Sequence, residues 1–129
     1  MFEDEKGPIE HYSFGKFIIS GREHSDYEKK IGAGKDIRVI GTMVSEWKER
    51  KGHVLSPAMI TGVFDSGTEI LVLGLGANGA LECPKEIPDY IKKNGISEVV
   101  QLKTPDACKA FNDFFRQGKK VAMLAHGTC

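Results

Sequence analysis

Histidine, threonine and cysteine stand close together at the end of the chain, in His126-Gly127-Thr128-Cys129. Histidine exchanges protons readily near neutral pH, and a neighbouring thiol becomes a nucleophile when an imidazole takes or stabilises its proton. His126 and Cys129 are therefore candidate catalytic residues. No third group that would orient the imidazole is evident, and a chain-terminal carboxylate beside Cys129 would oppose thiolate formation. The alternative is structural: the histidine hydrogen-bonds backbone while the tail closes a sheet edge.

The cysteines also bear on metal binding. A single His-x-x-Cys pair supplies too few ligands for zinc, so His53 and Cys83 would have to complete the set. The chain has three cysteines and no CxxC pair, which argues against a disulfide framework and against a zinc ribbon. We expect reduced thiols, with Cys108 in the core, and we expect neither a metal nor a cofactor.

A glycine-rich segment, Gly74-Leu75-Gly76-Ala77-Asn78-Gly79, follows an apolar run and fits the GxGxxG pattern. A dinucleotide site needs a helix to open at the third glycine, but Pro84 follows five residues later and no acidic residue ends the next strand. We favour a tight turn that lets two backbones pack closely. Its consecutive N–H groups could also hold a small anion, which makes four residues candidate ligands: Gly74, Gly76, Asn78 and Gly79.

The single tryptophan stands among cations, in Trp47-Lys48-Glu49-Arg50-Lys51-Gly52-His53. One interpretation is an exposed stacking or anion-binding surface that includes His53. The other is a hydrophobic plug with a solvated basic loop around it, and we favour the plug slightly.

The second half of the chain alternates apolar runs with helical patterns. We predict strands at 69–73, 97–102 and 121–125 and helices at 85–94 and 105–117. Such alternation is typical of a parallel sheet with right-handed crossovers. The carboxyl ends of parallel strands lie at one edge, where ligands of open α/β sheets usually bind. We therefore expect three segments to meet there: the loop 74–79, the helix start at Thr104, and the tail with His126 and Thr128.

The first half is less regular. Residues 1–8 are predicted to be a flexible leader, and short strands with turns follow from 9 to 40, with Gly32 and Gly34 marking a turn. Ser56-Pro57 is typical of a helix start, and apolar pairs at i, i+4 predict a helix that ends at Ser66-Gly67.

Length and composition limit the number of domains and the kinds of partner. The chain of 129 residues suits one domain spanning 1–129, and 18 basic residues balance 18 acidic ones, which argues against a nucleic-acid partner. The longest apolar run, Ile70–Ala77, is too short to span a membrane. The acidic start does not look like a secretory signal, so we expect a cytoplasmic protein.

The order and spacing of several motifs resemble the Mth-type domain-of-unknown-function family, which includes an adipogenesis-associated protein and an assembly factor of respiratory complex I. The likeness runs from Ile9 onward and is carried by Pro8 with Tyr12-Ser13-Phe14-Gly15, Trp47 with Gly52-His53, Ile70–Gly76, Thr104, Ala107, Asn112 and His126-x-Thr128-Cys129. The resemblance implies a three-layer α/β domain with a mixed central sheet and a small extra β portion from the first half.

The resemblance also implies a functional surface, without an established enzymatic activity or cofactor. The positions that carry over are Trp47, His53, Gly74, Gly76, Gly79, Thr104, His126, Thr128 and Cys129. Lys48 stands where an arginine is common, which makes a bidentate anion contact there less favourable. Without a mitochondrial-type leader, the organelle role is not transferred.

Two functions remain open at this stage. The first is a non-catalytic binding or assembly factor with a protein partner, which should expose an apolar patch or a patch centred on Trp47. The second is a small-molecule or anion site, and perhaps an enzyme, at the carboxyl edge of the sheet, with His126 or Cys129 as acid, base or nucleophile.

Overall fold

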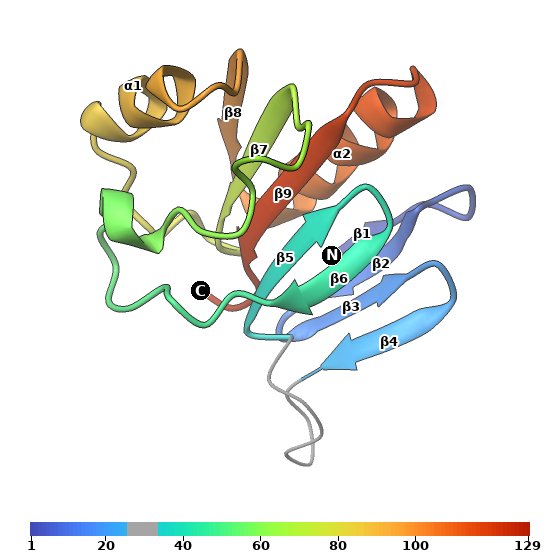
Figure 1. The fold of residues 1–129 in the computed structure, drawn as a ribbon. Coiled ribbons are helices and arrows are strands. Elements are labelled where there is room, and N and C mark those ends of the chain that lie inside the picture. Colours follow the sequence, from blue (N-terminus) through green and yellow to red (C-terminus); the bar gives the residue numbers. More distant parts are fainter. Residues whose placement is uncertain (26–33) are drawn as a thin grey trace.

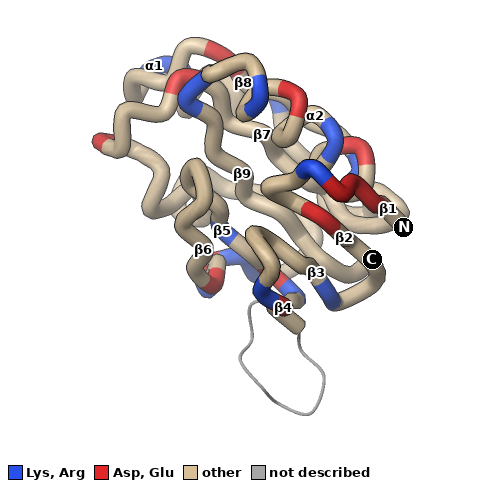
Figure 2. Tube along the Cα trace, turned by 90° about the vertical axis from the view of Figure 1, so that its right-hand side faces the viewer, with Lys and Arg blue, Asp and Glu red and all other residues tan. Residues whose placement is uncertain are grey.

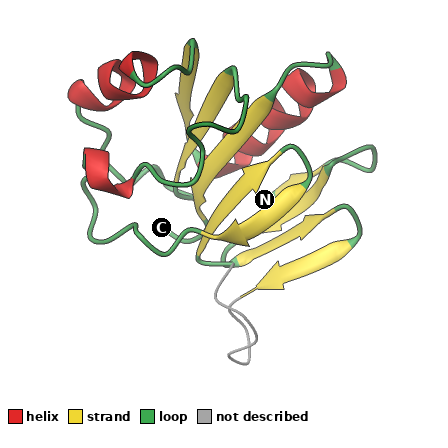
Figure 3. Ribbon diagram, in the orientation of Figure 1, coloured by secondary structure: helices red, strands yellow, loops and turns green. Residues whose placement is uncertain are grey.

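The computed structural model describes residues 1–25 and 34–129, so the turn expected at Gly32 lies outside the described residues. Two sheets and two α-helices form one α/β domain (Figures 1 and 3). The described elements are β1 (Phe2–Glu3), β2 (Ile9–Ser13), β3 (Lys16–Ile19), β4 (Arg22–Ser25), β5 (Asp36–Ile40), β6 (Met43–Glu46), the 3-10 turn η2 (Pro57–Met59), β7 (Ile70–Leu75), α1 (Glu86–Lys93), β8 (Glu98–Leu102), α2 (Thr104–Arg116) and β9 (Val121–His126).

The larger sheet is mixed and has the strand order β6-β5-β9-β7-β8. Strand β7 runs parallel to both of its neighbours, β8 and β9, as the alternation of strands and helices predicts. Strand β5 is antiparallel to β9 and to β6. The start of β5 therefore lies at the same sheet edge as the carboxyl ends of β7 and β9.

The central strands are apolar because both of their faces are covered. In β7, Ile70 and Val72 face one hydrophobic core while Leu71 and Leu73 face the other. Strand β9 alternates between the same two cores. This pattern explains why the sequence shows continuous apolar runs here rather than alternating ones.

The two helices cover opposite faces of this sheet (Figure 3). Ile87 and Ile91 of α1 join one core, and Ala107, Cys108 and Phe111 of α2 join the other. The chain passes from β7 to β8 on one side and then from β8 back to β9 on the other. Right-handed crossovers in opposite directions place their helices on opposite faces, which produces the three layers.

The small sheet is an antiparallel meander, β1-β2-β3-β4, on the α2 side of the molecule. Ile9, Tyr12 and Phe17 belong to the same core as Phe111. Asn112 of α2 is fully buried, and its side chain donates to the Ile9 carbonyl (2.8 Å) and accepts the Ile9 N–H (2.9 Å). One side-chain amide thus joins the small sheet to the helix.

The leader was predicted to be flexible, but the structure gives it partners. Phe2 and Glu3 pair with β2, and Asp4 accepts hydrogen bonds from Asn112 (3.1 Å) and Arg116 (2.7 Å). Polar groups at the end of α2 therefore hold the leader in place, together with the packing of Phe2 against the core.

The helix predicted from Ser56 to Ser66 is wrong. Only η2 is helical there, and Gly62 takes a positive φ of 72°. The Met59 carbonyl accepts the Trp47 indole N–H (2.7 Å), and the Thr61 carbonyl accepts Arg38 Nε–H (2.8 Å). These side chains use carbonyl groups that a longer helix would need for its own hydrogen bonds.

Two further observations concern partners. None of the described helices is long and apolar enough to cross a membrane. On the side of the molecule seen in Figure 2, segments with Lys and Arg are interspersed with segments carrying Asp and Glu.

Candidate functional site

The three segments expected at the carboxyl edge meet there. Thr104 is buried at the start of α2, where its hydroxyl accepts the Gly76 N–H (2.9 Å) and donates to the His126 carbonyl (2.7 Å). The Ala77 N–H donates to the Thr128 carbonyl (2.7 Å). The glycine loop, the helix start and the tail are thus bound directly to one another.

The contacts at this junction show which groups the N–H groups of the glycine loop bind. Gly76, Ala77 and Ala80 all donate their N–H groups to protein acceptors, two of them in the tail. A Cβ on Gly76 would overlap the Cys129 carbonyl. The interpretation as a close-packed turn is therefore confirmed. These three N–H groups already bond to protein acceptors, so they are not available to bind an anion.

Beside the junction lies a cavity of about 370 Å³, which we call the edge cavity. Its walls come from the start of β5, the loop after β6 and the tail after β9. The lining residues are Lys35, Arg50, Gly52, His53, His126, Thr128 and Cys129. Most of these carry cationic, imidazole, hydroxyl or thiol groups, so the edge cavity is rich in hydrogen-bonding chemistry.

His126 lies in the wall of the edge cavity and is oriented by Asp36. The antiparallel register of β5 and β9 places the two residues directly opposite each other. His126 Nδ1 lies 2.9 Å from Asp36 Oδ1, and His126 Nε2 lies 3.2 Å from the Thr128 hydroxyl. The imidazole is only 2% exposed, so these two contacts fix both of its nitrogens.

Arg50 completes this network. Its Nε–H donates to Asp36 Oδ1 at 2.5 Å, and its Nη1 donates to the Gly52 carbonyl. The Arg50 and Asp36 side chains are 8% and 11% exposed, so the pair is well shielded from water. Breaking such a pair is costly because it leaves an unpaired buried charge. Lys35 adds an ammonium group to the lining.

The thiol of Cys129 pairs differently from the prediction. Cys129 Sγ lies 4.0 Å from His53 Nε2, whereas His126 contacts Asp36 and Thr128. The two imidazole rings stand edge to face with centroids 6.5 Å apart. Burial raises the pKa of the Cys83 and Cys108 thiols, so these two stay protonated near neutral pH.

Trp47 is 1% exposed, and its indole N–H donates to the Met59 carbonyl. The plug interpretation is confirmed, and the alternative of an exposed stacking or docking surface formed by Trp47 is wrong. The tryptophan packs with Leu55 and Val63 in the core that α1 joins, because burial of its large ring stabilises a segment that lacks regular structure.

The remaining candidates lie outside the edge cavity. Asn78 and Gly79 are exposed on the glycine loop, and Gly74 is buried against Ala125. In residues 1–25 and 34–129, no three His, Cys, Asp or Glu side chains are placed to hold a metal ion together.

Sequence reasoning missed Asp36 and Lys35. Both precede or open a strand that was recognised, but their place depends on β5 pairing antiparallel with β9, and strand order in the first half was not predictable. The available signal was an acidic residue at the head of a strand in which Ile37 and Val39 are buried, since a buried carboxylate in a folded protein needs a partner.

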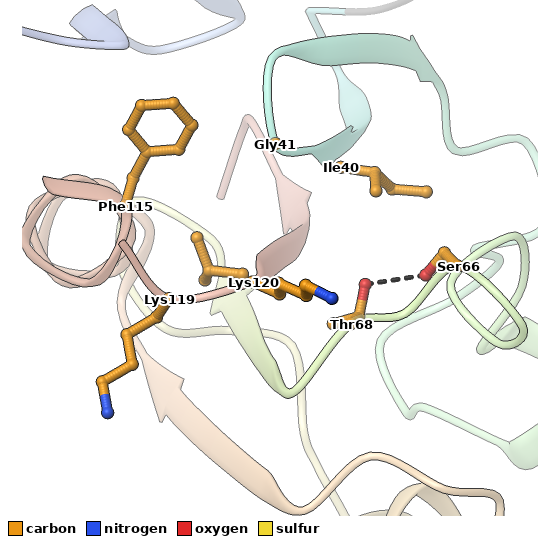
Figure 4. A pocket seen from close by; sticks show the side chains of 8 residues that line it. Ile40, Gly41, Ser66, Thr68, Phe115, Lys119 and Lys120 are labelled. Atoms are coloured by element: carbon orange, nitrogen blue, oxygen red, sulfur yellow. Dashed lines mark hydrogen bonds between the residues drawn. The ribbon is translucent and has the colours of Figure 1, made fainter. Parts of the chain in front are cut away.

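A second cavity, of about 280 Å³, lies at the other end of β9 (Figure 4). Its lining residues are Ile40, Gly41, Ser66, Thr68, Phe115, Lys119, Lys120 and Val121. The Ser66 and Thr68 hydroxyls bond to each other (2.7 Å), and Figure 4 shows the Lys120 side chain extending toward Thr68. Among the described residues that line it there is no imidazole, carboxylate or thiol.

Together, the fold and the edge cavity define a three-layer α/β domain whose polar site sits at the carboxyl edge of a mixed sheet. Residues 9–126 match the family described as "Protein of unknown function (DUF498/DUF598)", and the chain belongs to that family. The Mth-type resemblance inferred from the motifs is thereby confirmed.

Solved structures share this fold. The protein MT938 superposes with a TM-score of 0.71 at 23% identity, covering 94% of this chain and 97% of that one. A conserved hypothetical protein, PH1505 from Pyrococcus horikoshii OT3, gives a TM-score of 0.70 at 21% identity, with 94% and 98% covered. A Mth938-like domain from Bordetella pertussis, solved by NMR in solution, gives 0.57 at 14% identity, with 92% and 84% covered.

Proposed function

We propose that this protein binds a small anionic molecule, of the carboxylate or phosphate class, in the edge cavity. The observation that carries the proposal is the lining itself: Lys35, Arg50 and two imidazoles surround one small space. The cavity is in the size range of small-molecule sites, which usually combine a few convergent polar groups.

The charge around the edge cavity favours an anion. Asp36 is the only carboxylate side chain that we find in direct contact with these lining groups in the described part of the chain, and Arg50 and His126 both bond to it. Lys35 therefore adds a further positive charge to the lining, while the Cys129 carbonyl oxygen is turned to the glycine loop, where it accepts the Ala80 N–H (3.2 Å). Partly enclosed cations attract anions more strongly than exposed ones do, because water screens them less.

A protein partner and a cytoplasmic location stay predictions. Burial of Trp47 removes one of the two surface features that would mark a docking site, whereas the polar lining of the edge cavity supports the small-ligand proposal directly.

Isothermal titration calorimetry tests the proposal with acetate, succinate and inorganic phosphate as separate probes. We expect saturable binding of at least one probe, weakened by added salt because the attraction is electrostatic. Lys35→Ala should weaken that binding, since it removes one of the lining cations.

Lys120→Ala is the matched control. It removes the same charge from the second cavity, so binding should stay as in the parent protein. Equal losses in the two variants, or no heat above dilution with any probe, would overturn the proposal.

A further inference from the structure

The Thr128 hydroxyl occupies a special position between His126 and the edge cavity. It lies 3.2 Å from His126 Nε2, and Thr128 itself lines the cavity. The Thr128 methyl group faces the other way, because a Cβ built on Gly15 would lie 3.9 Å from it. The hydroxyl is thus held on the imidazole side.

The hydrogen bonds fix the direction of proton transfer. The Asp36 carboxylate, paired with Arg50, can only accept, so His126 Nδ1 carries the hydrogen between them. In a neutral imidazole Nε2 is then an acceptor, and the Thr128 hydroxyl donates to it. An acid, an imidazole and a hydroxyl in this order are the arrangement that activates a hydroxyl nucleophile.

We propose that Thr128 is a nucleophile served by His126 and positioned by Asp36, and that the protein hydrolyses esters of small anionic acids in the edge cavity. The choice of substrate rests on the proposed anion binding, because Lys35 and Arg50 would hold the carboxylate end of such an ester.

The reaction balances with water as the second substrate. Thr128 Oγ attacks the ester carbonyl carbon while His126 Nε2 takes the hydroxyl proton. The C–O bond to the alcohol then breaks, and the alcohol leaves with that proton, which produces an acyl-threonine. Water attacks the acyl-threonine with His126 again as base, and the acid departs as Thr128 regains its proton.

The test uses the mono-para-nitrophenyl ester of succinate as an anionic substrate and para-nitrophenyl acetate as a neutral one. We expect nitrophenolate release, preference for the anionic ester, and a succinyl adduct that peptide mapping by mass spectrometry places on Thr128. Thr128→Val removes the attacking oxygen together with the proton transfer that serves it, so it should lower the rate by about 100-fold or more and should abolish the adduct.

Thr42→Val makes the same change at an exposed turn residue of the β5–β6 hairpin and should leave the rate unchanged. Asp36→Asn tests positioning: the amide permits the wrong imidazole tautomer, so kcat should fall, while succinate binding by calorimetry reports separately on Arg50, which loses its ion pair. Thr128→Ser retains a hydroxyl and should still form the adduct.

Succinate binding is measured by calorimetry on the same samples, which separates the two proposals. Binding without Thr128-dependent hydrolysis would overturn the nucleophile and leave the anion site standing. An adduct on Cys129 or on lysine instead of Thr128 would also overturn it.

Discussion

Gly76 shows how a single residue holds the tail in place. It has a φ of 99°, and a Cβ there would meet the Cys129 carbonyl. We expect Gly76→Ala to lower the free energy of unfolding by about 3 kcal/mol or more, because strained backbone and overpacking add. Urea unfolding followed by circular dichroism measures this.

Gly95 is the matched control, since its φ of 101° is nearly the same and nothing lies within 4 Å of a Cβ there. Gly95→Ala should cost only the backbone strain, about 1–2 kcal/mol. If the two variants are equally destabilised, close packing of the tail on the loop contributes nothing.

At the level of residues, the sequence predicted part of the site. Spacing at the end of the chain singled out His126, Thr128 and Cys129, and the basic loop contributed His53. Asp36 was not predictable, because nothing local says which histidine a strand-leading aspartate will meet. That pairing depends on strand register, a long-range property.

Among the elements, α2 shows where helical periodicity predicts well and where it does not. The helical spacing of Ala107, Ala110, Phe111, Phe114 and Phe115 indicates one apolar face, but of the three phenylalanines only Phe111 is fully buried. The opposite error concerns Asn112, a polar residue that is fully buried because its amide bonds the β2 backbone.

We therefore expect two different costs from alanine substitutions in α2. Phe111→Ala should lower the free energy of unfolding by about 3–5 kcal/mol, since it leaves a cavity in the core. Phe114→Ala should cost about 1–2 kcal/mol, since part of that ring already contacts water. Guanidinium unfolding of both variants checks this, and equal midpoints would contradict the observed helix orientation.

Another element-level prediction concerns the leader and the end of α2. The hydrogen bond from Arg116 lowers the pKa of the Asp4 carboxyl below its ordinary value. A lowered folded-state pKa adds stability above the unfolded pKa of about 4, and that stability is lost as pH falls through the folded value. Asp4→Asn should therefore be less stable than the parent at pH 7, and this difference in the free energy of unfolding should narrow as the pH falls below about 4.

Urea unfolding of both proteins across this pH range measures the gap. Arg116→Gln removes the cause of the pKa shift, so its difference in the free energy of unfolding from the parent should also narrow at low pH. The destabilisation of the double variant should be smaller than the sum of the two single effects. A gap that stays constant with pH would mean that Asp4 titrates alike in the folded and unfolded chains.

The segment between β6 and β7 shows where local sequence patterns fail to predict the structure. Ser56-Pro57 and the apolar spacing that followed were good helix signals, yet only η2 formed. Trp47 and Arg38 capture carbonyl groups of this segment from outside it. These tertiary hydrogen bonds outweighed the helix propensity of the segment, and no local sequence pattern predicts them.

For the whole molecule, parallel strands explain why three segments far apart in the sequence could be predicted to meet at one edge of the sheet. The glycine loop, Thr104 and the tail meet because β7 and β9 end at the same edge. The edge cavity lies beside that junction, where antiparallel β5 adds Lys35 and Asp36. The sequence thus predicted which segments meet at this edge of the sheet. The position of the edge cavity depends on the antiparallel pairing of β5 with β9, and a mixed sheet was expected only from the family resemblance.

The four histidines provide the most direct test of the edge cavity as an anion site. His53 and His126 line the edge cavity, whereas His11 and His24 lie on β2 and β4 of the small sheet. Proton–carbon correlation spectra of the imidazole rings, recorded during a succinate or phosphate titration, report on all four at once. Binding in the edge cavity predicts saturable shifts of His53 and His126 with His11 and His24 unmoved. Shifts confined to His11 and His24, or no saturable shift of any histidine, would contradict it.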